Sequence, residues 1–197
     1  LNKQELRHST YWGPFIKLME ELSEDQFWPD CGLFSANDFR RMLDVEYISE
    51  LAICHLHGPQ NKKDRLDDWY ATYESGFSES REVKATFQAV IGELSQTMPD
   101  LRRTRWRNKS DFYTLFDVLS THKGKLPLAS DKRELLRTEL VRFGEEVSAG
   151  LAKDAKRPRR KLVRSYVSAV ERAATDVANR EARSEALASA LKQVLSG

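Results

Sequence analysis

The chain has 197 residues, of which 32 are Lys or Arg and 30 are Asp or Glu, so its formal net charge is +2. This length suffices for one large domain or two small ones, and a core of that size is stable without disulfide bonds or structural metals. No apolar run approaches the roughly 20 residues of a membrane span, and the two cysteines suggest no disulfide framework. We therefore expect a cytoplasmic protein with no membrane partner, whose small net charge conceals clusters of basic residues.

The first predicted helix begins at the start of the chain. Asn2 and Glu5 have the spacing of a capping box, in which each side chain accepts a hydrogen bond from a backbone N–H of the first turn.

Apolar residues at spacings of three and four predict further helices. These stripes cover residues 45–56, 66–73, 83–98, 112–119 and 136–147. Residues 160–195 contain no proline or glycine and predict one long helix or two in succession.

These patterns predict the fold class and the domain organisation. No segment shows a sustained β alternation, so we expect an all-α fold, an irregular multi-helix bundle without a sheet. Breaks containing proline or glycine are short, which favours helices that pack as one unit. We expect residues 1–152 to form a helical bundle. Residues 153–197 would then add a basic linker and a C-terminal helix or helix pair packed on that bundle.

Two clusters of basic residues are the strongest functional signal. The guanidinium group of arginine can donate two parallel hydrogen bonds to phosphate oxygens, and an indole among the arginines can stack on a base or sugar. The alternative is that these are charged loops and helix flanks, with Trp106 folded into the core. The predicted DNA-contacting residues are Arg102, Arg103, Arg105, Trp106, Arg107 and Lys109 in the first cluster, and Lys156, Arg157, Arg159, Arg160, Lys161 and Arg164 in the second, which begins at Lys153.

Motifs of catalysis and metal binding are missing from the sequence. There is no phosphate-cradling glycine loop, nucleophile elbow or zinc-hydrolase helix motif. Cys54 and His57 have a spacing that would let them share a metal ion, but no second pair of ligands matches them. We predict no catalytic residue, no metal ligand and no cofactor within this chain.

The opening segment resembles a known family. Asn2, Gln4, Glu5 and Arg7, followed by the apolar residues 15–22, are similar to the "LN-x-QELR-N" segment that follows the catalytic half of GmrSD-type proteins, the ParB-like nuclease/NTPase family of bacterial defence. His8 stands where the family usually has asparagine. Looser similarities are found at Asp38-Phe39, Arg41-Met42, Asp44, Glu46, Asn108-Lys109, Asp111-Phe112-Tyr113, Asp176, Arg180 and Arg183.

The resemblance implies a role within a larger protein. The family's Asp-Gly-Gln-Gln-Arg stretch is absent here, so this chain would correspond to the helical region after the catalytic half. The parent would be a restriction or anti-phage endonuclease that uses a nucleoside triphosphate and a divalent metal, and the opening motif could face its catalytic domain. An ordinary structural role is the alternative, in which Glu5 caps, Leu6 packs and Arg7 pairs with a neighbour.

Three functions remain open from the sequence. The first is a helical domain that supports an upstream nuclease domain and contacts DNA phosphates. The second is a protein-interaction or homodimerisation module with no DNA role, in which one apolar face stays open to a partner. The third is a self-contained enzyme, which would need convergent titratable groups in a pocket.

Overall fold

The computed structural model describes residues 2–61, 65–172 and 174–195, and it confirms the all-α prediction. These residues contain no β-strand. The helices are α1 (Lys3–Thr10), α2 (Pro14–Ser23), α3 (Phe27–Cys31), α4 (Ala36–Arg40), α5 (Leu43–His57), α6 (Leu66–Thr72), α7 (Ser80–Thr97), α8 (Lys109–Thr121), α9 (Ser130–Gly150), α10 (Lys161–Glu171), α11 (Val177–Ala190) and α12 (Lys192–Leu195). Short 3-10 helices are η1 (Leu101–Arg103), η2 (Arg105–Arg107) and η3 (Lys123–Lys125).

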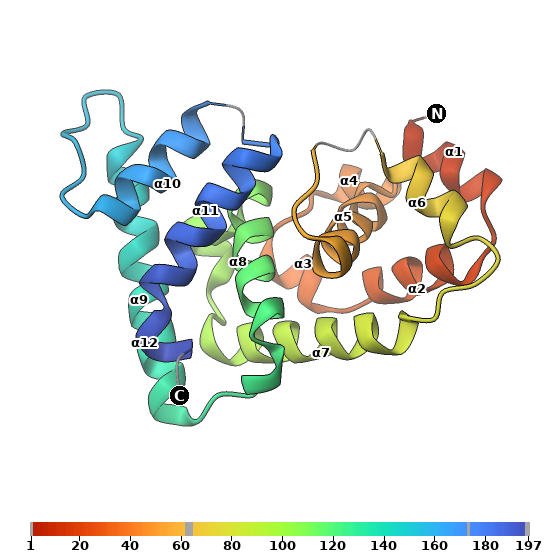
Figure 1. The fold of residues 1–197 in the computed structure, drawn as a ribbon, viewed down its shortest axis with the longest axis horizontal. Helices are drawn as coiled ribbons and strands as arrows, with labels where there is room; N and C mark the ends of the chain where they lie inside the picture. The colour runs from red at the N-terminus through yellow and green to blue at the C-terminus, as the bar shows by residue number, and fades with distance from the viewer. Residues whose placement is uncertain (1, 62–64, 173, 196–197) are drawn as a thin grey trace.

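The helices form two groups that meet in the middle of the molecule (Figure 1). Helices α1 to α6 lie at one end, helices α8 to α12 lie at the other, and α7 runs along one side. Contacts of α5 with α8, and of α7 with both α8 and α9, join the two groups. We call residues 1–100 the N-terminal region and residues 101–197 the C-terminal region.

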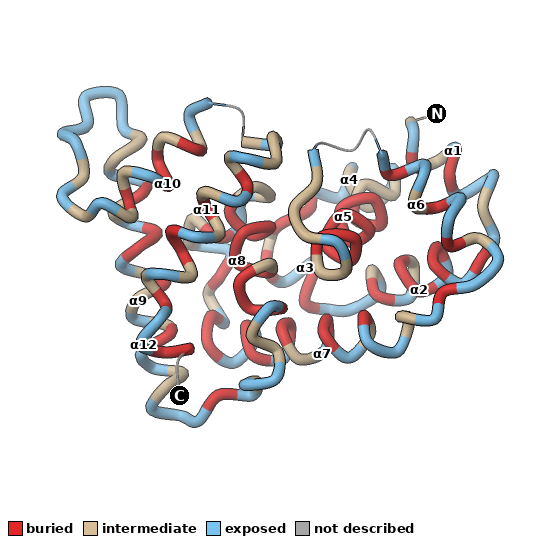
Figure 2. The backbone as a smooth tube through the Cα atoms, viewed as in Figure 1, coloured by how far each residue is buried: buried red, intermediate tan, exposed pale blue. Residues whose placement is uncertain are grey.

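One hydrophobic core runs through both regions, and the buried stretches face inward (Figure 2). Leu51, Phe87 and Phe116 are completely buried on α5, α7 and α8. Phe143 on α9 and Tyr166 on α10 are equally buried and belong to the same cluster. Helices α10 and α11 pack on each other, on α9 and on α8. The residues after 152 therefore complete the core built by the preceding helices.

Local sequence signals explain where several helices begin and end. The predicted capping box is present: the Asn2 side chain accepts from the Glu5 N–H at 2.8 Å, and Glu5 accepts from the Asn2 N–H at 2.6 Å. Gly58 ends α5 with φ = 76°, a conformation that glycine adopts at little cost. The C-terminal tail, expected as one or two helices, is divided into three, α10, α11 and the short α12, and Asp176, in extended conformation, stands at the N-cap of α11. None of the described helices is long and apolar enough to cross a membrane.

Candidate nucleic-acid interface

The two regions carry opposite charge. The N-terminal region has 10 basic and 18 acidic residues, whereas the C-terminal region has 22 basic and 12 acidic residues. The small net charge of the chain is therefore the sum of an acidic half and a basic half. Because α1 to α6 and α8 to α12 lie at opposite ends of the molecule (Figure 1), the excess of basic residues belongs to the end formed by α8 to α12. A polyanion would be attracted to that end.

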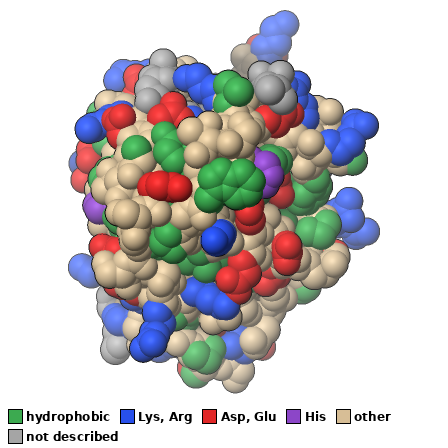
Figure 3. All heavy atoms as spheres, turned by 90° about the vertical axis from the view of Figure 1, so that its right-hand side faces the viewer, with side chains coloured by type: hydrophobic (Ala, Val, Ile, Leu, Met, Phe, Trp, Pro, Cys, Tyr) green, Lys and Arg blue, Asp and Glu red, His purple; other side chains and the backbone are tan. Residues whose placement is uncertain are grey.

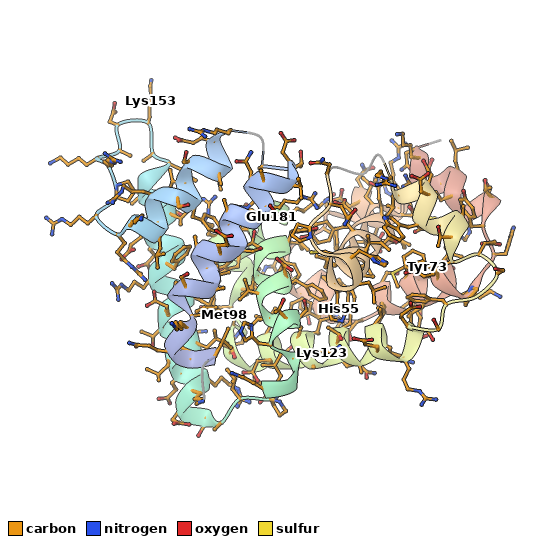
Figure 4. All side chains as sticks on the ribbon, viewed as in Figure 1. His55, Tyr73, Met98, Lys123, Lys153 and Glu181 are labelled. Atoms are coloured by element: carbon orange, nitrogen blue, oxygen red, sulfur yellow. The ribbon has the colours of Figure 1, made fainter. Side chains whose placement is uncertain are left out.

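The loop between α9 and α10 holds the densest group of free cations. Its exposed basic side chains have no carboxylate of the described residues within ion-pair distance. Lys153 points away from the helices at the tip of this loop (Figure 4). We call this group the basic loop, which comprises Lys153, Lys156, Arg157, Arg159 and Lys161.

Arg160 and Arg164, which were predicted to contact DNA, instead hold the base of this loop. Arg160 donates to Glu139 at 2.5 Å and to Glu146 at 3.3 Å, and its guanidinium lies over a core aromatic ring. Arg164 donates to the backbone carbonyls of Pro158 and Arg159. Both side chains are partly buried and committed to the fold. The loop is consequently tied to α9 and α10 while its other cations face the solvent.

Trp106 was predicted to stack on a base, and the structure excludes it from that role. Its side chain is 1% exposed, and its Nε1 donates to the Leu140 carbonyl oxygen at 3.0 Å. The indole also lies near Phe143, with ring centroids 6.4 Å apart. The tryptophan therefore anchors η2 to α9 and has no free face for a nucleotide.

Two cations of the first cluster are likewise engaged within the chain. Arg105 pairs at 3.1 Å with Asp111, which is completely buried. Lys109 pairs with Asp38 at 3.3 Å and lies over the Phe34 ring. The exposed cations without a carboxylate partner among the described residues are Arg102, Arg103 and Arg107.

Helix α9 lies between the two clusters. Arg103 and Arg105 border a surface hollow with Gly144 and other α9 residues. The basic loop borders a second hollow with Gly150. Residues 144 and 148 point to the side of α9 opposite to residues 146 and 150, because two positions along a helix are about 200° apart. The clusters thus flank one helix, and the basic loop is the larger candidate interface.

The opening motif, predicted as an interface, is mostly interior. Gln4 is completely buried and Arg7 is 2% exposed. Arg7 pairs with buried Glu46 at 2.8 Å and with Asp67 at 2.6 Å, which joins α1 to α5 and α6. Gln4 donates to Tyr70 Oη at 2.9 Å. These two residues present no surface to another domain.

Asn2 and Glu5, the remaining residues of the motif, stabilise the first turn of α1. Asn2 and Glu5 form the capping box, and each also contacts Arg41: Asn2 Nδ2 donates to its carbonyl oxygen at 2.8 Å, and Glu5 pairs with its Nε at 3.3 Å. If the motif had an ordinary structural role, Leu6 was expected to pack against the core. Leu6 is 49% exposed, so that expectation is wrong. The same interpretation predicted that Glu5 caps the helix and that Arg7 pairs with a neighbour, and both are observed.

Potential metal ligands on α5 face different partners. Cys54 donates to the Asp117 carboxylate at 3.5 Å, while His57 contacts Tyr73 Oη at 2.8 Å and stacks on Trp69. Burial is the main cause that raises the pKa of Cys54, so its thiol stays protonated. In the described ranges, no group of three or more His, Cys, Asp or Glu side chains could hold a metal ion.

Comparisons with models of protein families, with curated proteins and with solved structures found no match. The resemblance to GmrSD-type proteins therefore rests on the sequence motifs alone.

Proposed function

We propose that this chain is a helical DNA-contacting domain whose basic loop binds phosphate groups without reading the base sequence. The observation that carries the proposal is the set of exposed cations in residues 153–161 that have no acidic partner among the described residues. Contacts between Lys or Arg and phosphates release counterions and supply most of the free energy of non-specific DNA binding.

The electrostatics of the rest of the molecule support this assignment. Eight acidic side chains in excess lie in the N-terminal region and ten basic side chains in excess lie in the C-terminal region. A duplex would be repelled by the first and attracted to the second, so the charge distribution orients the domain on DNA. Arg160 and Arg164 fix the base of the loop, which lowers the entropy that its free cations lose on binding.

The family resemblance supports a more specific proposal about the parent protein. In this proposal, the domain belongs to a ParB-like restriction or anti-phage nuclease, packs against the upstream catalytic half and holds DNA near it. The nucleoside triphosphate and divalent metal of such an enzyme would act in that other half. Any catalytic activity would then belong to the assembled protein.

The test is a fluorescence-anisotropy titration of the chain with a labelled duplex at several salt concentrations. If the five cations of the basic loop each neutralise a phosphate, the logarithm of the affinity falls with the logarithm of the salt concentration with a slope of roughly −4 to −5. Absence of binding at low salt would contradict the proposal and move the role to scaffolding.

A charge-reversal pair localises the interaction. The variant Lys156→Glu/Arg157→Glu/Arg159→Glu should flatten the slope to about −2, because three of the five phosphate contacts are lost. The matched control, Lys17→Glu/Arg40→Glu/Arg81→Glu, makes the same change in net charge with exposed residues of the N-terminal region. Equal losses in both variants would show that total charge, rather than the loop, determines binding.

A second candidate function is protein docking at the opposite end of the molecule. Trp12 is 66% exposed although its backbone N–H donates to Glu74 at 2.9 Å, so the indole is presented from a fixed turn. Figure 3 shows this end, where hydrophobic side chains gather among acidic and basic ones. Exposed tryptophans are favoured as anchors of protein interfaces.

The docking candidate is tested by adding the upstream catalytic domain in trans to the wild-type chain and to Trp12→Ala. Docking through this face predicts a complex in size-exclusion chromatography that the variant weakens by at least about tenfold, since interface tryptophans commonly contribute 2 kcal/mol or more. A complex of unchanged affinity would exclude Trp12 as the anchor.

A further inference from the structure

A cavity of about 560 Å³ lies at the junction of the two regions, between helices α5, α8 and α11. Its volume falls in the range typical of small-molecule sites, about 300–1,000 Å³. Apolar and aromatic walls come from Leu43, Tyr47 and Tyr113. Neither the basic loop nor the buried network around Arg7 contributes to it. The cavity is thus separate from the proposed DNA interface.

The walls of the cavity contain more cations than carboxylates. Lys3, Lys109, Arg180 and Arg183 border it, whereas Glu50 is the single carboxylate among the residues that line it. That carboxylate is already engaged, because Arg180 pairs with it at 3.0 Å. Lys109 is engaged as well, by Asp38 outside the lining, so Lys3 and Arg183 are the lining cations without a carboxylate partner among the described residues. Arg180 also lies 4.0 Å from the centre of the Tyr113 ring, which fixes the guanidinium against the wall.

Arg183 is a buried cation of this lining that forms no ion pair with a carboxylate of the described residues. It is completely buried, its Nε donates to Thr114 Oγ1 at 3.1 Å, and its Nη1 has no hydrogen-bond partner. Among the described residues Arg183 forms no ion pair with a carboxylate; the Asp111 carboxylate, whose charge acts on it, pairs with Arg105 at 3.1 Å. Burial lowers the pKa of Arg183, although Tyr166 and the Asp111 carboxylate act in the opposite direction, so the fold balances this charge only in part.

The helix ends around the cavity favour negative charge as well. Leu43 is the first residue of α5, Lys109 is the first residue of α8, and Ala174 and Thr175 shortly precede α11. Each helix N-terminus carries about half a positive charge. Three such ends and one buried arginine without an ion pair among the described residues, all bordering one cavity, form an electropositive site with an apolar body.

We propose that this cavity binds a small organic anion, with its carboxylate or phosphate group against the wall that Arg180 and Arg183 form and its apolar body between Leu43, Tyr47 and Tyr113. The partly apolar lining excludes inorganic anions as the best ligand, because they would leave the aromatic walls uncovered. This inference is independent of the proposed DNA contact, and failure of one leaves the other intact.

The experiment uses three probes of similar size on the whole chain: benzoate, phenyl phosphate and the neutral benzyl alcohol. Binding is followed by the NMR resonances of the Arg183 Nε–H and of the Ser110 and Thr175 amides. We expect saturable shifts from an anion and at least about tenfold weaker binding of the alcohol, because it cannot pair with a guanidinium. The stronger anion identifies the head group. Equal responses to all three probes, or no response, would overturn the proposal.

A matched pair of variants separates charge from folding. Ser110→Glu places a carboxylate at the cavity in the first turn of α8, where the helix dipole favours it, so the fold is retained. Ser130→Glu makes the same change in the first turn of α9, away from the cavity. Anion affinity should fall at least about fivefold in the first variant and stay unchanged in the second. Equal affinities in both would overturn the assignment of the site.

The variant Arg183→Met tests the arginine directly. Replacing a buried charge that lacks an ionic partner by an apolar side chain should leave the chain folded. We expect it to abolish the preference for the anions over benzyl alcohol. A folded variant that keeps this preference would overturn the role of Arg183, and the pair of serine variants decides the question if the chain does not fold.

Discussion

The N-terminal and C-terminal regions share one helical core but use their charged side chains differently. In the N-terminal region, Arg7, Arg41 and Lys84 each pair with an acidic residue from another helix or helix cap, and acidic residues are in excess. In the C-terminal region, basic residues are in excess, and those of the basic loop stay without partners among the described residues. The difference teaches that the excess of basic side chains, and the basic loop with its unpaired cations among the described residues, belong to the C-terminal region.

The comparison also separates two kinds of basic residue that look alike in sequence. Arg105 and Arg160 pair with carboxylates of their own chain, whereas Arg157 and Arg159 have no such pair within the part of the chain that the structure describes. Residues of the first kind should affect stability when replaced, and residues of the second kind should affect binding. The following predictions test this division, beginning with the largest expected effect.

Replacing Trp106 by alanine should lower the free energy of unfolding by about 4 kcal/mol, since a buried tryptophan loses its packing and leaves a cavity. Arg103→Ala, a neighbour in the same cluster, should change it by less than about 0.5 kcal/mol because its side chain is exposed. Urea unfolding of both variants measures the contrast. A near-wild-type stability of Trp106→Ala would show that the indole does not hold η2 to α9.

Arg7→Met should destabilise the chain by about 3 kcal/mol, because Glu46 stays buried after its ionic partner is removed. The double variant Arg7→Met/Glu46→Leu should recover part of this loss, since no buried carboxylate then remains at that position. Arg157→Met is the control in the basic loop and should be neutral. Additive effects of the two single substitutions, measured by the same unfolding assay, would argue against the buried ion pair.

His55, at the contact of α5 with α7 and α8, predicts a pH dependence of stability. Burial, assisted by the Lys123 ammonium (Figure 4), lowers the pKa of His55 below its usual value of 6.5, although Glu82 and Asp117 oppose this. The unfolded chain then binds a proton more readily than the folded chain, so stability is lost as the pH falls below 6.5. Between pH 7.5 and 5.5, the wild type should lose more stability than His55→Gln. Equal losses would contradict the lowered pKa.

The smallest expected effect concerns the first helix. Asn2→Ala removes one half of the capping box and should lower the free energy of unfolding by about 1 kcal/mol. Asn2→Asp keeps an acceptor for the Glu5 N–H and should cost less. If the two variants are equally stable, the cap contributes little and the contact with Arg41 is the more important role of Asn2.

The elements that depend on local sequence could be predicted, and those that depend on distant partners could not. The stripe from Val83 to Met98 identified α7, because its periodicity fixes one buried face. Asn2 and Glu5 identified the start of α1 for the same local reason. The partner of Lys109, however, is Asp38, 71 residues away, and no spacing rule relates them.

The candidate site shows the same limit. Sequence composition identified both basic clusters but could not distinguish Arg157, which pairs with no carboxylate in the described ranges, from Arg160, which bridges two carboxylates of α9. It also could not decide between a stacking and a buried Trp106, because that depends on the position of Phe143 and Leu140. The cavity at Arg183 is formed by three helices that come from both regions, so only the assembled fold brings its walls together.

The most direct test of the contrast between the two regions is an NMR titration of the labelled chain with a short DNA duplex at low salt. The account predicts that the amide shifts fall on residues 152–164, with weaker ones at Arg102, Arg103 and Arg107, and that α1, α2 and α6 are unaffected. Shifts centred on the N-terminal region, or spread evenly over both regions, would contradict the assignment of the basic loop as the DNA-contacting surface.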